Sequence, residues 1–280
     1  MKHLKRFLLI LNKIFTNEIY NNSKSTGPDD PLTRIINKIP EYEKKIKEIK
    51  KSVSFEDKNL FWYPYSTLST LYELDTVLTK NNRDIFSLSQ NMPIADIGAA
   101  DGDLAFFLEN LGFSNVHIID NGPTNCNRLK GAYILKKEIN SCVTIHDINL
   151  DEDFNLPSQK FGLIFMLGTL YHLKNPFFVL EKLAKYSKWL LLGTRTMRKL
   201  FNVKKDLSTF PIAYLLNSYE CNNDSTNYWV FTNEGLKRLL LRSGWDIYDF
   251  GFCGYKNSTP TTMNKMQKTY CLAKSRLFKE

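Results

Sequence analysis

The sequence of 280 residues has few cysteines, and their spacing builds no recognisable scaffold. The five cysteines are an odd number, lie far apart and form no C-x-x-C pair. This pattern argues against a disulfide framework and against a zinc ribbon. We therefore interpret the cysteines as reduced thiols of a cytoplasmic protein, and we predict no metal site.

At its N-terminus the sequence lacks a hydrophobic run long enough to cross a bilayer. The apolar run from Phe7 to Leu11 is short, and Asn12 and Lys13 interrupt it with no small-residue cleavage site after them. We expect residues 1–15 to form a helix that docks on the domain. The alternative is an interfacial helix that makes a peripheral membrane contact and associates the protein with a lipid surface.

Strong charge of one sign is absent from most of the chain. The net charge of +9 comes from the two ends, because residues 1–51 contain 12 Lys and Arg against 6 Asp and Glu, and residues 256–280 contain 6 against 1. The 204 residues between them contain 20 against 22. Basic ends can attract nucleic acid or an anionic membrane, but the near-neutral middle argues against a basic groove along the whole protein.

The N-terminal part of the chain combines polar and helical segments. Residues 21–33, "NNSKSTGPDDPLT", are rich in turn residues and predict a linker, whereas "EYEKKIKEIKK" predicts a solvated helix. The aromatic cluster "FWYPY" then precedes a helical pattern that begins at Ser66. We expect residues 1–85 to form a helical extension that caps the substrate site, with Tyr63 and Tyr65 at the substrate. Core packing is the alternative role for these aromatic side chains.

In the rest of the chain, short apolar runs alternate with helical patterns, which is typical of a parallel sheet with crossover helices. The predicted strands are "PIADI", "NVHIID", "CVTIHDI", "GLIFML" and "WLLLGT", followed by the closing strands "WDIYDFGF" and "KTYCLAKS". We predict helices that begin near Gly102, Asn127 and Pro176. A further helix covers "TNEGLKRLLLRSGW", with Thr232 as its N-cap and Gly244 as its stop. In such a sheet, ligands bind at the carboxyl ends of the strands.

The stretch "DIGAADGD", which begins at Asp96, follows the first predicted strand. Gly98 and Gly102 allow backbone conformations that a side chain would block, and they let a ligand approach the main chain. Asp96, Asp101 and Asp103 place negative charge at the turn, which would repel the pyrophosphate of a dinucleotide and disfavours an NAD-dependent oxidoreductase. The turn therefore favours a phosphate-free, cationic ligand such as S-adenosylmethionine, with its sulfonium and ammonium groups.

An acidic side chain at the end of the second predicted strand supports this interpretation. Asp120 ends "VHIID", 22 residues after Gly98, where a carboxylate accepts hydrogen bonds from both ribose hydroxyls of a bound nucleoside. A strand-terminal Asp is otherwise a simple turn residue. The glycine turn at this spacing favours the binding role.

Together, "DIGAADGD", Asp120 and the later "LGTLYHLKNP" resemble a class I S-adenosylmethionine-dependent methyltransferase, over roughly residues 90–275. The segment "FGLIFMLGTLYHLKNPF" is similar, more narrowly, to the tRNA wobble-uridine methyltransferase-like group. The resemblance implies a Rossmann-like α/β domain over residues 86–280, with a seven-stranded, mostly parallel sheet whose last strand is antiparallel. It implies cofactor contacts at Asp96, Gly98, Ala99, Asp101, Gly102, Asp120, Asp147, Asn149, Leu167 and Tyr171.

Two details of the implied cofactor site stay open. In "HDIN" either Asp147 or Asn149 faces the adenine, with His146 as a structural neighbour. Members of the group that use a carboxylated cofactor hold the extra carboxylate with basic and aromatic groups. Tyr171 matches such a position, but we can place no convincing arginine near "NKMQKTYCL", although Lys268 lies there. We therefore expect the ordinary cofactor, S-adenosylmethionine.

Methyl transfer requires an oriented nucleophile and a group that accepts its proton, because the cofactor supplies the electrophile. His172 follows Tyr171 after the fourth strand and is a candidate general base, since an imidazole pKa of about 6.5 suits neutral pH. Its alternative role is to support the loop through hydrogen bonds. Asp224 is a second candidate base, and with Tyr171 these residues form the predicted catalytic set.

The stretch "NSYECNNDSTNYWVFT", residues 217–232, overlaps an insertion over residues 196–231 that we expect to cover the acceptor site. Its amides and aromatic faces suit a sugar or another polyhydroxylated acceptor. The candidate substrate-binding residues here are Asn222, Asn223, Asn227 and Trp229. The alternative is a capped turn in which Asn and Asp side chains bond to their own backbone.

These features predict an S-adenosylmethionine-dependent O-methyltransferase that acts on a small-molecule, glycan or lipid-linked hydroxyl. A tRNA uridine methyltransferase is the alternative, indicated by "LYHLKNP" and the basic ends. A non-catalytic, cofactor-binding subunit that regulates a partner is a third hypothesis.

Overall fold

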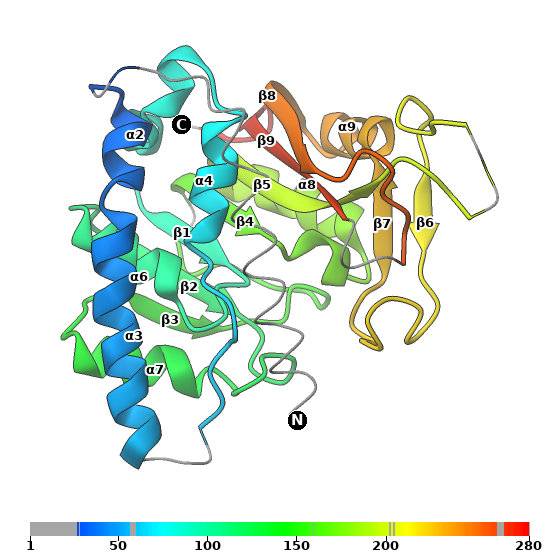
Figure 1. Cartoon of the computed structure of the whole chain (residues 1–280). Coiled ribbons are helices and arrows are strands. Elements are labelled where there is room, and N and C mark those ends of the chain that lie inside the picture. Colours follow the sequence, from blue (N-terminus) through cyan, green and yellow to red (C-terminus); the bar gives the residue numbers. More distant parts are fainter. Residues whose placement is uncertain are drawn as a thin grey trace.

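The computed structural model of the chain describes residues 27, 29–56, 60–158, 160–201, 203, 205–261 and 266–279 (Figure 1). The helix expected over residues 1–15, and with it the expected membrane contact, lies outside the described residues. In the described parts of the chain, no helix is long and apolar enough to cross a membrane. The five cysteines are all free in the structure.

A nine-stranded sheet forms the centre of the molecule, and seven of its strands run in the order β3-β2-β1-β4-β5-β9-β8. Among these seven, all neighbouring strands pair in parallel except β9, which is antiparallel to both β5 and β8. The predicted fold class is confirmed, and so are the seven strands. Their bounds are β1 Ile94–Ile97, β2 Val116–Asp120, β3 Thr144–Asp147, β4 Phe161–Leu167, β5 Ser187–Met197, β8 Trp245–Gly254 and β9 Gln267–Ser275.

Helices cover both faces of this sheet, because its central strands are apolar on both sides. Successive residues of β1 show the alternation: Ile94 packs in one hydrophobic cluster and Ala95 in the other. The first cluster includes α6 (Asp103–Asn110) and α7 (Lys130–Glu138), and the second includes α8 (Pro176–Tyr186) and α9 (Asn233–Arg242). The side chain of Thr232 accepts a hydrogen bond from the Gly235 amide at 3.1 Å, which confirms Thr232 as the N-cap of α9.

The N-terminal helices belong to the same core as the first face of the sheet (Figure 1). They are α2 (Pro31–Ile36), α3 (Ile39–Glu56), α4 (Ser69–Asp75) and α5 (Ile85–Ser89), with a 3-10 turn, η2, at Lys80–Arg83. Ile39, Tyr42 and Ile46 of α3 are buried. The prediction of a solvated helix was therefore wrong for one side of α3, because a charge-rich sequence can still carry an apolar stripe.

The predicted linker over residues 21–33 is also shorter than expected where it is described. Pro31 is the first residue of α2, and the Asp30 carboxylate caps that helix by accepting from the Thr33 amide at 2.9 Å. The guanidinium of Arg83 binds Asp30 at 2.7 Å and also binds Asp75 of α4. This buried network joins the start of α2 to the end of α4.

Two short strands that the sequence did not predict lie in the insertion. β6 (Ala213–Leu215) and β7 (Trp229–Thr232) form an antiparallel hairpin. β7 also pairs in parallel with Thr196 and Met197 of β5, beyond Gly193, where the pairing with β4 ends. Because β9 occupies the other edge of β5 at Thr196, the hairpin extends the sheet on the edge that β4 leaves free. It therefore stands next to the carboxyl end of β4.

A pair of histidines links β2 and β3. His117 Nδ1 and His146 Nε2 are 3.0 Å apart, and His117 Nε2 lies 2.9 Å from the side-chain oxygen of Asn115. Burial lowers the pKa of both histidines, and His146 adds to the effect on His117. The structural role expected of His146 agrees with this geometry.

We expect acid to destabilise the fold through this pair. The unfolded chain protonates its histidines near pH 6.5, whereas the folded state keeps this pair neutral to lower pH, so the unfolded state binds more protons below pH 6.5 and stability falls as the pH falls. Urea unfolding at pH 7.5 and pH 5.5 measures this loss. The variant His117→Gln should show a smaller loss than the wild type, and an equal loss in both proteins would contradict the assignment.

Candidate functional site

The glycine turn between β1 and α6 is built by left-handed backbone and a close approach. Gly98 has φ +72°, Ala100 +58° and Gly102 +85°. A Cβ atom on Gly98 would overlap the side chain of Thr169, whose hydroxyl donates to the carbonyl of Ile97 at 3.1 Å. Gly98 is thus required both for its backbone conformation and for the contact with the loop that follows β4. The turn and that loop form one surface at the carboxyl edge of the sheet.

Asp120 lies beside this turn, as its spacing predicted. Its carboxylate accepts hydrogen bonds from the Ala100 amide at 3.0 Å, from the Asn121 amide at 2.7 Å and from the Asn125 side chain at 3.1 Å. Burial raises the pKa of Asp120 despite these hydrogen bonds. The end of β2 and the glycine turn therefore form one unit, in which hydrogen bonds fix a carboxylate next to the left-handed backbone of the turn.

Asp96 provides a second carboxylate below the turn. It is 3% exposed, and its Oδ2 atom is buried without a hydrogen-bond partner among the residues that the structure describes. Burial, with a further contribution from the charge of Asp120, raises the pKa of Asp96 to about 8. A buried oxygen without a donor is costly, and the raised pKa means that Asp96 is largely protonated at pH 7.

The other two carboxylates of the turn share one cation within the protein. Lys50 of α3 places its ammonium 3.0 Å from Asp101 Oδ2 and 2.8 Å from Asp103 Oδ1. Asp101 also accepts from the Tyr63 amide at 3.0 Å and from the Asn127 side chain at 2.7 Å. Asp101, which stays a predicted cofactor contact, also holds three segments of the chain together. Lys50 offsets one of the two negative charges of Asp101 and Asp103, so the turn repels a pyrophosphate less strongly than its three carboxylates predict.

At the end of β3 the two candidates for the adenine contact differ in their surroundings. Asp147 pairs in register with Asp120 and accepts from the Gly122 amide at 2.7 Å. The side chain of Asn149 instead donates to Glu152 at 2.7 Å and accepts from the Asp151 amide at 3.1 Å. Asp147 therefore borders the turn after β2, whereas Asn149 stabilises the turn in which it lies.

The loop after β4 carries the predicted catalytic side chains. Leu167 ends β4 and is half-buried, and a short 3-10 turn, η3 (Leu170–His172), follows. The carbonyl of Tyr171 accepts from the Tyr228 amide at 2.9 Å, which fixes the loop to the start of β7. The rings of Tyr171 and His172 are 4.1 Å apart. Burial raises the pKa of Tyr171 to about 12 and lowers that of His172, so both groups are neutral at pH 7.

His172 is held by a chain of hydrogen bonds from the insertion. Its Nδ1 atom lies 3.0 Å from the Thr226 carbonyl and 3.1 Å from the Thr226 hydroxyl. That hydroxyl donates to Asp224 Oδ1 at 2.7 Å. Because Thr226 donates to Asp224, its oxygen accepts from His172, and the proton of neutral His172 lies on Nδ1. This leaves Nε2 unprotonated, which is the state that a general base requires.

Asp224 therefore contacts His172 only indirectly, through Thr226. Its Oδ1 atom accepts from both the amide and the hydroxyl of Thr226. The two candidate bases named from the sequence are therefore connected, with Asp224 orienting Thr226 and Thr226 orienting His172. Sequence reasoning did not assign this role to Thr226, because its partner lies 54 residues away.

The amide-rich stretch of the insertion forms a turn, as the alternative interpretation holds. Asn222 and Asn223 are exposed and have φ values of +62° and +56°, a conformation that Asn tolerates well. Asn227 is 4% exposed and donates to the carbonyls of Cys221 and Asp224, each at 3.3 Å. The backbone of Asn222 and Asn223 and the side chain of Asn227 therefore shape the turn, and the substrate contacts of these residues stay predictions.

The aromatic substrate candidates occupy two places. Trp229 donates from Nε1 to the Lys174 carbonyl at 3.3 Å and lies beside the loop after β4. Tyr63 and Tyr65 lie near the glycine turn, with their rings 5.6 Å apart in an edge-to-face arrangement. The residues predicted to bind substrate therefore do not form a single cluster, and the two tyrosines lie closer to the residues expected to bind the cofactor.

An arginine that the sequence analysis missed lies at the carboxyl end of β5. Arg195 is 4% exposed, contacts the sulfur of Cys221 and donates to the Pro260 carbonyl at 3.1 Å. It pairs in register with Lys268 of β9, which binds Glu73 of α4 at 3.2 Å. The sequence near Lys268 contains no arginine, but pairing of distant strands supplies one. The sequence signal that could have identified Arg195 is that it is the lone charged residue in the apolar strand "WLLLGTRTM".

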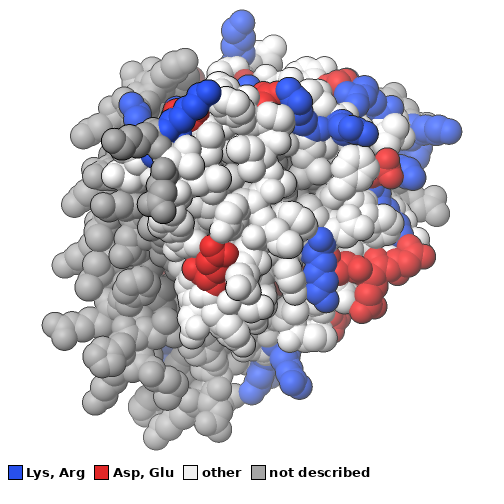
Figure 2. All heavy atoms as spheres, turned by 90° about the vertical axis from the view of Figure 1, so that its right-hand side faces the viewer, with Lys and Arg blue, Asp and Glu red and all other residues white. Residues whose placement is uncertain are grey.

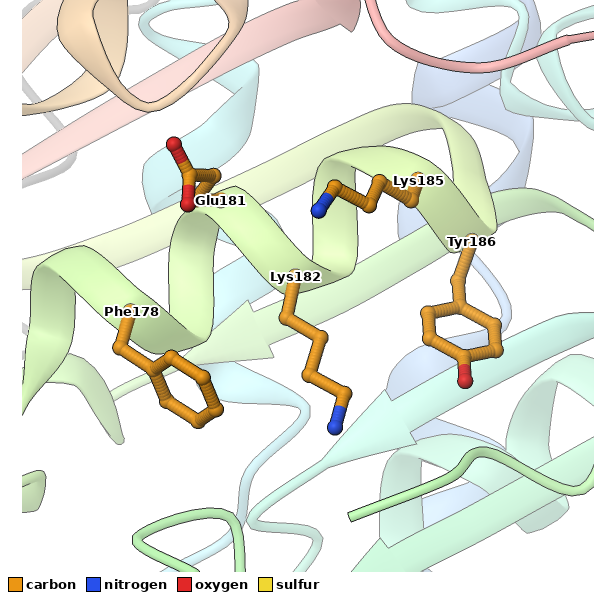
Figure 3. Close-up of a pocket in the computed structure, with 5 residues that line it drawn as sticks. All are labelled: Phe178, Glu181, Lys182, Lys185 and Tyr186. Carbon is orange, nitrogen blue, oxygen red and sulfur yellow. The ribbon is translucent and has the colours of Figure 1, made fainter. Parts of the chain in front are cut away.

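A separate hollow of about 520 Å³ lies along α8 (Figure 3). Its lining comes from that helix alone: Phe178, Glu181, Lys182, Lys185 and Tyr186. Helix α8 packs on the face of the sheet opposite α6. This hollow is therefore distinct from the glycine turn and from the loop after β4.

The fold is that of the class I S-adenosylmethionine-dependent methyltransferases. The N-terminal domain of EvdMO1, solved with SAH bound, matches with a TM-score of 0.52 and 13% identity over 85% of this chain and 97% of that domain. The same domain, solved in the presence of SAH and D-fucose, matches with a TM-score of 0.50 and 15% identity over 69% of this chain and 81% of that one.

An S-adenosylmethionine-dependent methyltransferase from Methanosarcina mazei matches with a TM-score of 0.50 and 17% identity, over 68% of this chain and 96% of that one. The chain covers 40% of full-length EvdMO1. No protein-family model matches the sequence, and no curated protein matches it. At these identities the likeness establishes the fold, and the activity has to be argued from the site.

Proposed function

We propose that the protein is an S-adenosylmethionine-dependent methyltransferase that transfers a methyl group to a hydroxyl of a small-molecule, glycan or lipid-linked acceptor. The observation that carries the proposal is the pair of carboxylates at the glycine turn. Asp120 is fixed there by the Ala100 amide at 3.0 Å, and the buried Oδ2 atom of Asp96 has no donor among the described residues. The fold alone would serve many activities.

The residues of this site fit the cofactor in chemistry. S-Adenosylmethionine, when bound, supplies the electrophilic methyl group. Asp120 is suited to accept from the ribose hydroxyls, as a carboxylate at the end of β2 does in related sheets. The buried oxygen of Asp96 is suited to accept from the ammonium group. Asp147 is the better placed of the two candidates for the adenine, because it borders the turn after β2.

The acceptor hydroxyl needs a base, and we assign that role to His172. Its Nδ1 proton is engaged by Thr226, so Nε2 is free to accept a proton from the acceptor. Asp224 then acts through Thr226 and not on the acceptor. The Tyr171 ring next to His172 excludes water from one side of the imidazole.

Replacement of Asp120 tests the cofactor site. Asp120→Ala should weaken SAH binding about 10- to 150-fold, since hydrogen bonds to a charged group contribute about 1.5 to 3 kcal/mol. Titration calorimetry measures this, with Asp153→Ala as a control because that carboxylate is 92% exposed. Asp120→Asn preserves an acceptor for the Ala100 amide and separates lost affinity from lost folding. Unchanged affinity in both Asp120 variants would refute the assignment.

An uncharged acceptor is supported by the surface beside the site. Viewed from the side of β6 and β7, most of the described surface belongs to uncharged residues (Figure 2). Within the insertion, Phe201, Leu215 and Tyr219 are more than half exposed. A tRNA substrate would call for many phosphate-binding Lys and Arg side chains. The D-fucose present with the EvdMO1 domain also supports a sugar acceptor.

The acceptor class is tested with labelled S-adenosylmethionine and fractionated cell extract. Label in a glycan, lipid or small-molecule fraction, stable to mild base, would support an O-methylated hydroxyl. Label in tRNA would replace this proposal with the uridine methyltransferase. Cofactor binding without transfer to any fraction would favour the regulatory subunit.

A further inference from the structure

A segment between α3 and α4 crosses the edge of the proposed cofactor site. We call residues 60–66 the strap. The amide of Tyr63 donates to Asp101 of the glycine turn at 3.0 Å, and the hydroxyl of Tyr63 accepts from the Cys126 amide at 3.1 Å. The Asn127 side chain donates to the Phe61 carbonyl at 3.0 Å. The strap is therefore fixed both to the glycine turn and to the segment that leads into α7.

Lys50 of α3 joins the strap to the turn. Its side chain is 15% exposed and that of Asp101 is 1% exposed, so their contact at 3.0 Å is shielded from water. The ammonium lies 5.3 Å from the centre of the Trp62 ring, and Trp62 donates to Ser54 of α3 at 2.9 Å. A cation over an aromatic face is attractive. Three elements, α3, the strap and the glycine turn, thus meet at the Asp101 carboxylate.

Tyr65 is the residue of the strap that is placed to touch a ligand. It is 50% exposed. Its ring lies 5.6 Å from that of Tyr63 in an edge-to-face arrangement, and Tyr63 is bonded to Asp101 of the glycine turn and to the Cys126 amide after β2. Tyr65 therefore lies beside the glycine turn and the segment after β2, and burial of its hydroxyl raises its pKa. Both segments border the proposed cofactor site.

We propose that the strap closes one side of the cofactor site, that Tyr65 contacts the bound cofactor, and that Lys50 positions the strap through Asp101. This inference rests on the proposed function. It assigns Tyr63 and Tyr65 to the cofactor side of the site, in place of the substrate. The N-terminal helices then contribute to cofactor binding as well as to the core.

Replacement of Tyr65 tests the contact. An aromatic face near a cationic or planar ligand contributes enough that Tyr65→Ala should weaken SAH binding about tenfold. The matched control is Tyr133→Ala on α7, because Tyr133 is 52% exposed and belongs to no part of the site. Titration calorimetry compares the two variants with the wild type. Equal affinity for SAH in all three proteins would overturn the role of Tyr65.

Replacement of Lys50 tests the positioning role. Lys50→Met leaves Asp101 and Asp103 buried without their cation, so we expect the affinity for SAH to fall about tenfold or more, while the exposed neighbour variant Lys51→Met keeps it. If Lys50→Met does not fold, Asn127→Ala serves instead, because it removes the hydrogen bonds to Asp101 and Phe61. A folded variant with wild-type affinity would overturn the positioning role of Lys50.

Hydrogen exchange gives a measurement that would not change if the strap had a purely structural role. On addition of SAH, the amides of the strap in the wild-type protein should exchange more slowly, and this protection should be smaller in Tyr65→Ala. If the wild type does not bind SAH at all, the proposed function fails. If it binds SAH while exchange in the strap stays unchanged, the strap inference fails and the proposed function stands.

Discussion

His172→Ala lowers methyl transfer by about 10²- to 10⁴-fold, the usual contribution of a positioned general base, and leaves the affinity for SAH unchanged. The physical reason is the state of the imidazole. Nδ1–H of His172 donates a hydrogen bond to Thr226, and burial lowers the pKa of His172, so Nε2 is available as a base at pH 7. The measurement is incorporation of labelled methyl groups into the extract fraction that accepts them, alongside calorimetry with SAH.

The pH profile and two neighbouring variants separate a base from a structural histidine. Because the pKa of His172 lies below its usual value of 6.5, the rate should be level from pH 7 to pH 8 and fall in acid as the imidazole becomes protonated. Thr226→Val and Asp224→Asn should lower the rate less than His172→Ala and shift the acid limb, since they remove its orienting contacts. Full activity in His172→Ala would make this histidine structural.

The sheet could be predicted from the sequence because each strand is marked locally. "PIADI" and "VHIID" are apolar runs that end in an acidic residue or a glycine turn, and their pairing follows from the rules for parallel sheets. Asp120 could be placed next to Gly98 on these grounds alone. The N-cap Thr232 was predicted for the same reason, since a cap is a property of a few adjacent residues.

Contacts between distant segments could not be predicted in this way. Lys50 lies 51 residues from Asp101 in a run of similar lysines, and nothing local distinguishes it from Lys51. The hairpin of β6 and β7 is too short for a periodic signal, and Thr226 acquires its role only through this hairpin. Arg195 likewise meets Lys268 only because β5 and β9 pair.

The revised charge of the turn changes how ligand selectivity is explained. Because Lys50 pairs with both Asp101 and Asp103, the carboxylates left to face a ligand are those of Asp96 and Asp120. Burial raises the pKa of both groups, so the site holds less negative charge than the sequence suggests. A cationic ligand group would favour the ionised form of Asp96, and this coupling can be measured directly.

Asp96→Asn raises the free energy of unfolding at pH 8.5 by several kcal/mol, since burial raises the pKa of Asp96 from 3.8 to about 8 and each pKa unit corresponds to about 1.4 kcal/mol. The folded state binds more protons than the unfolded state between these values, so wild-type stability falls as the pH rises from about 4 to 8. The uncharged amide of the variant carries no such penalty. Urea unfolding at pH 5 and pH 8.5 should therefore show a difference between the proteins that grows with pH.

The same variant should bind SAH more weakly, because Asp96 in its ionised form accepts from the ammonium group of the ligand. Binding at pH 7 should then release close to one proton from wild-type Asp96 and none from the variant. Calorimetry in two buffers of different ionisation enthalpy measures the released protons, with Asp153→Asn as the control for loss of one exposed negative charge. A variant that is more stable yet binds SAH with wild-type affinity and proton release would show that Asp96 is only a structural residue.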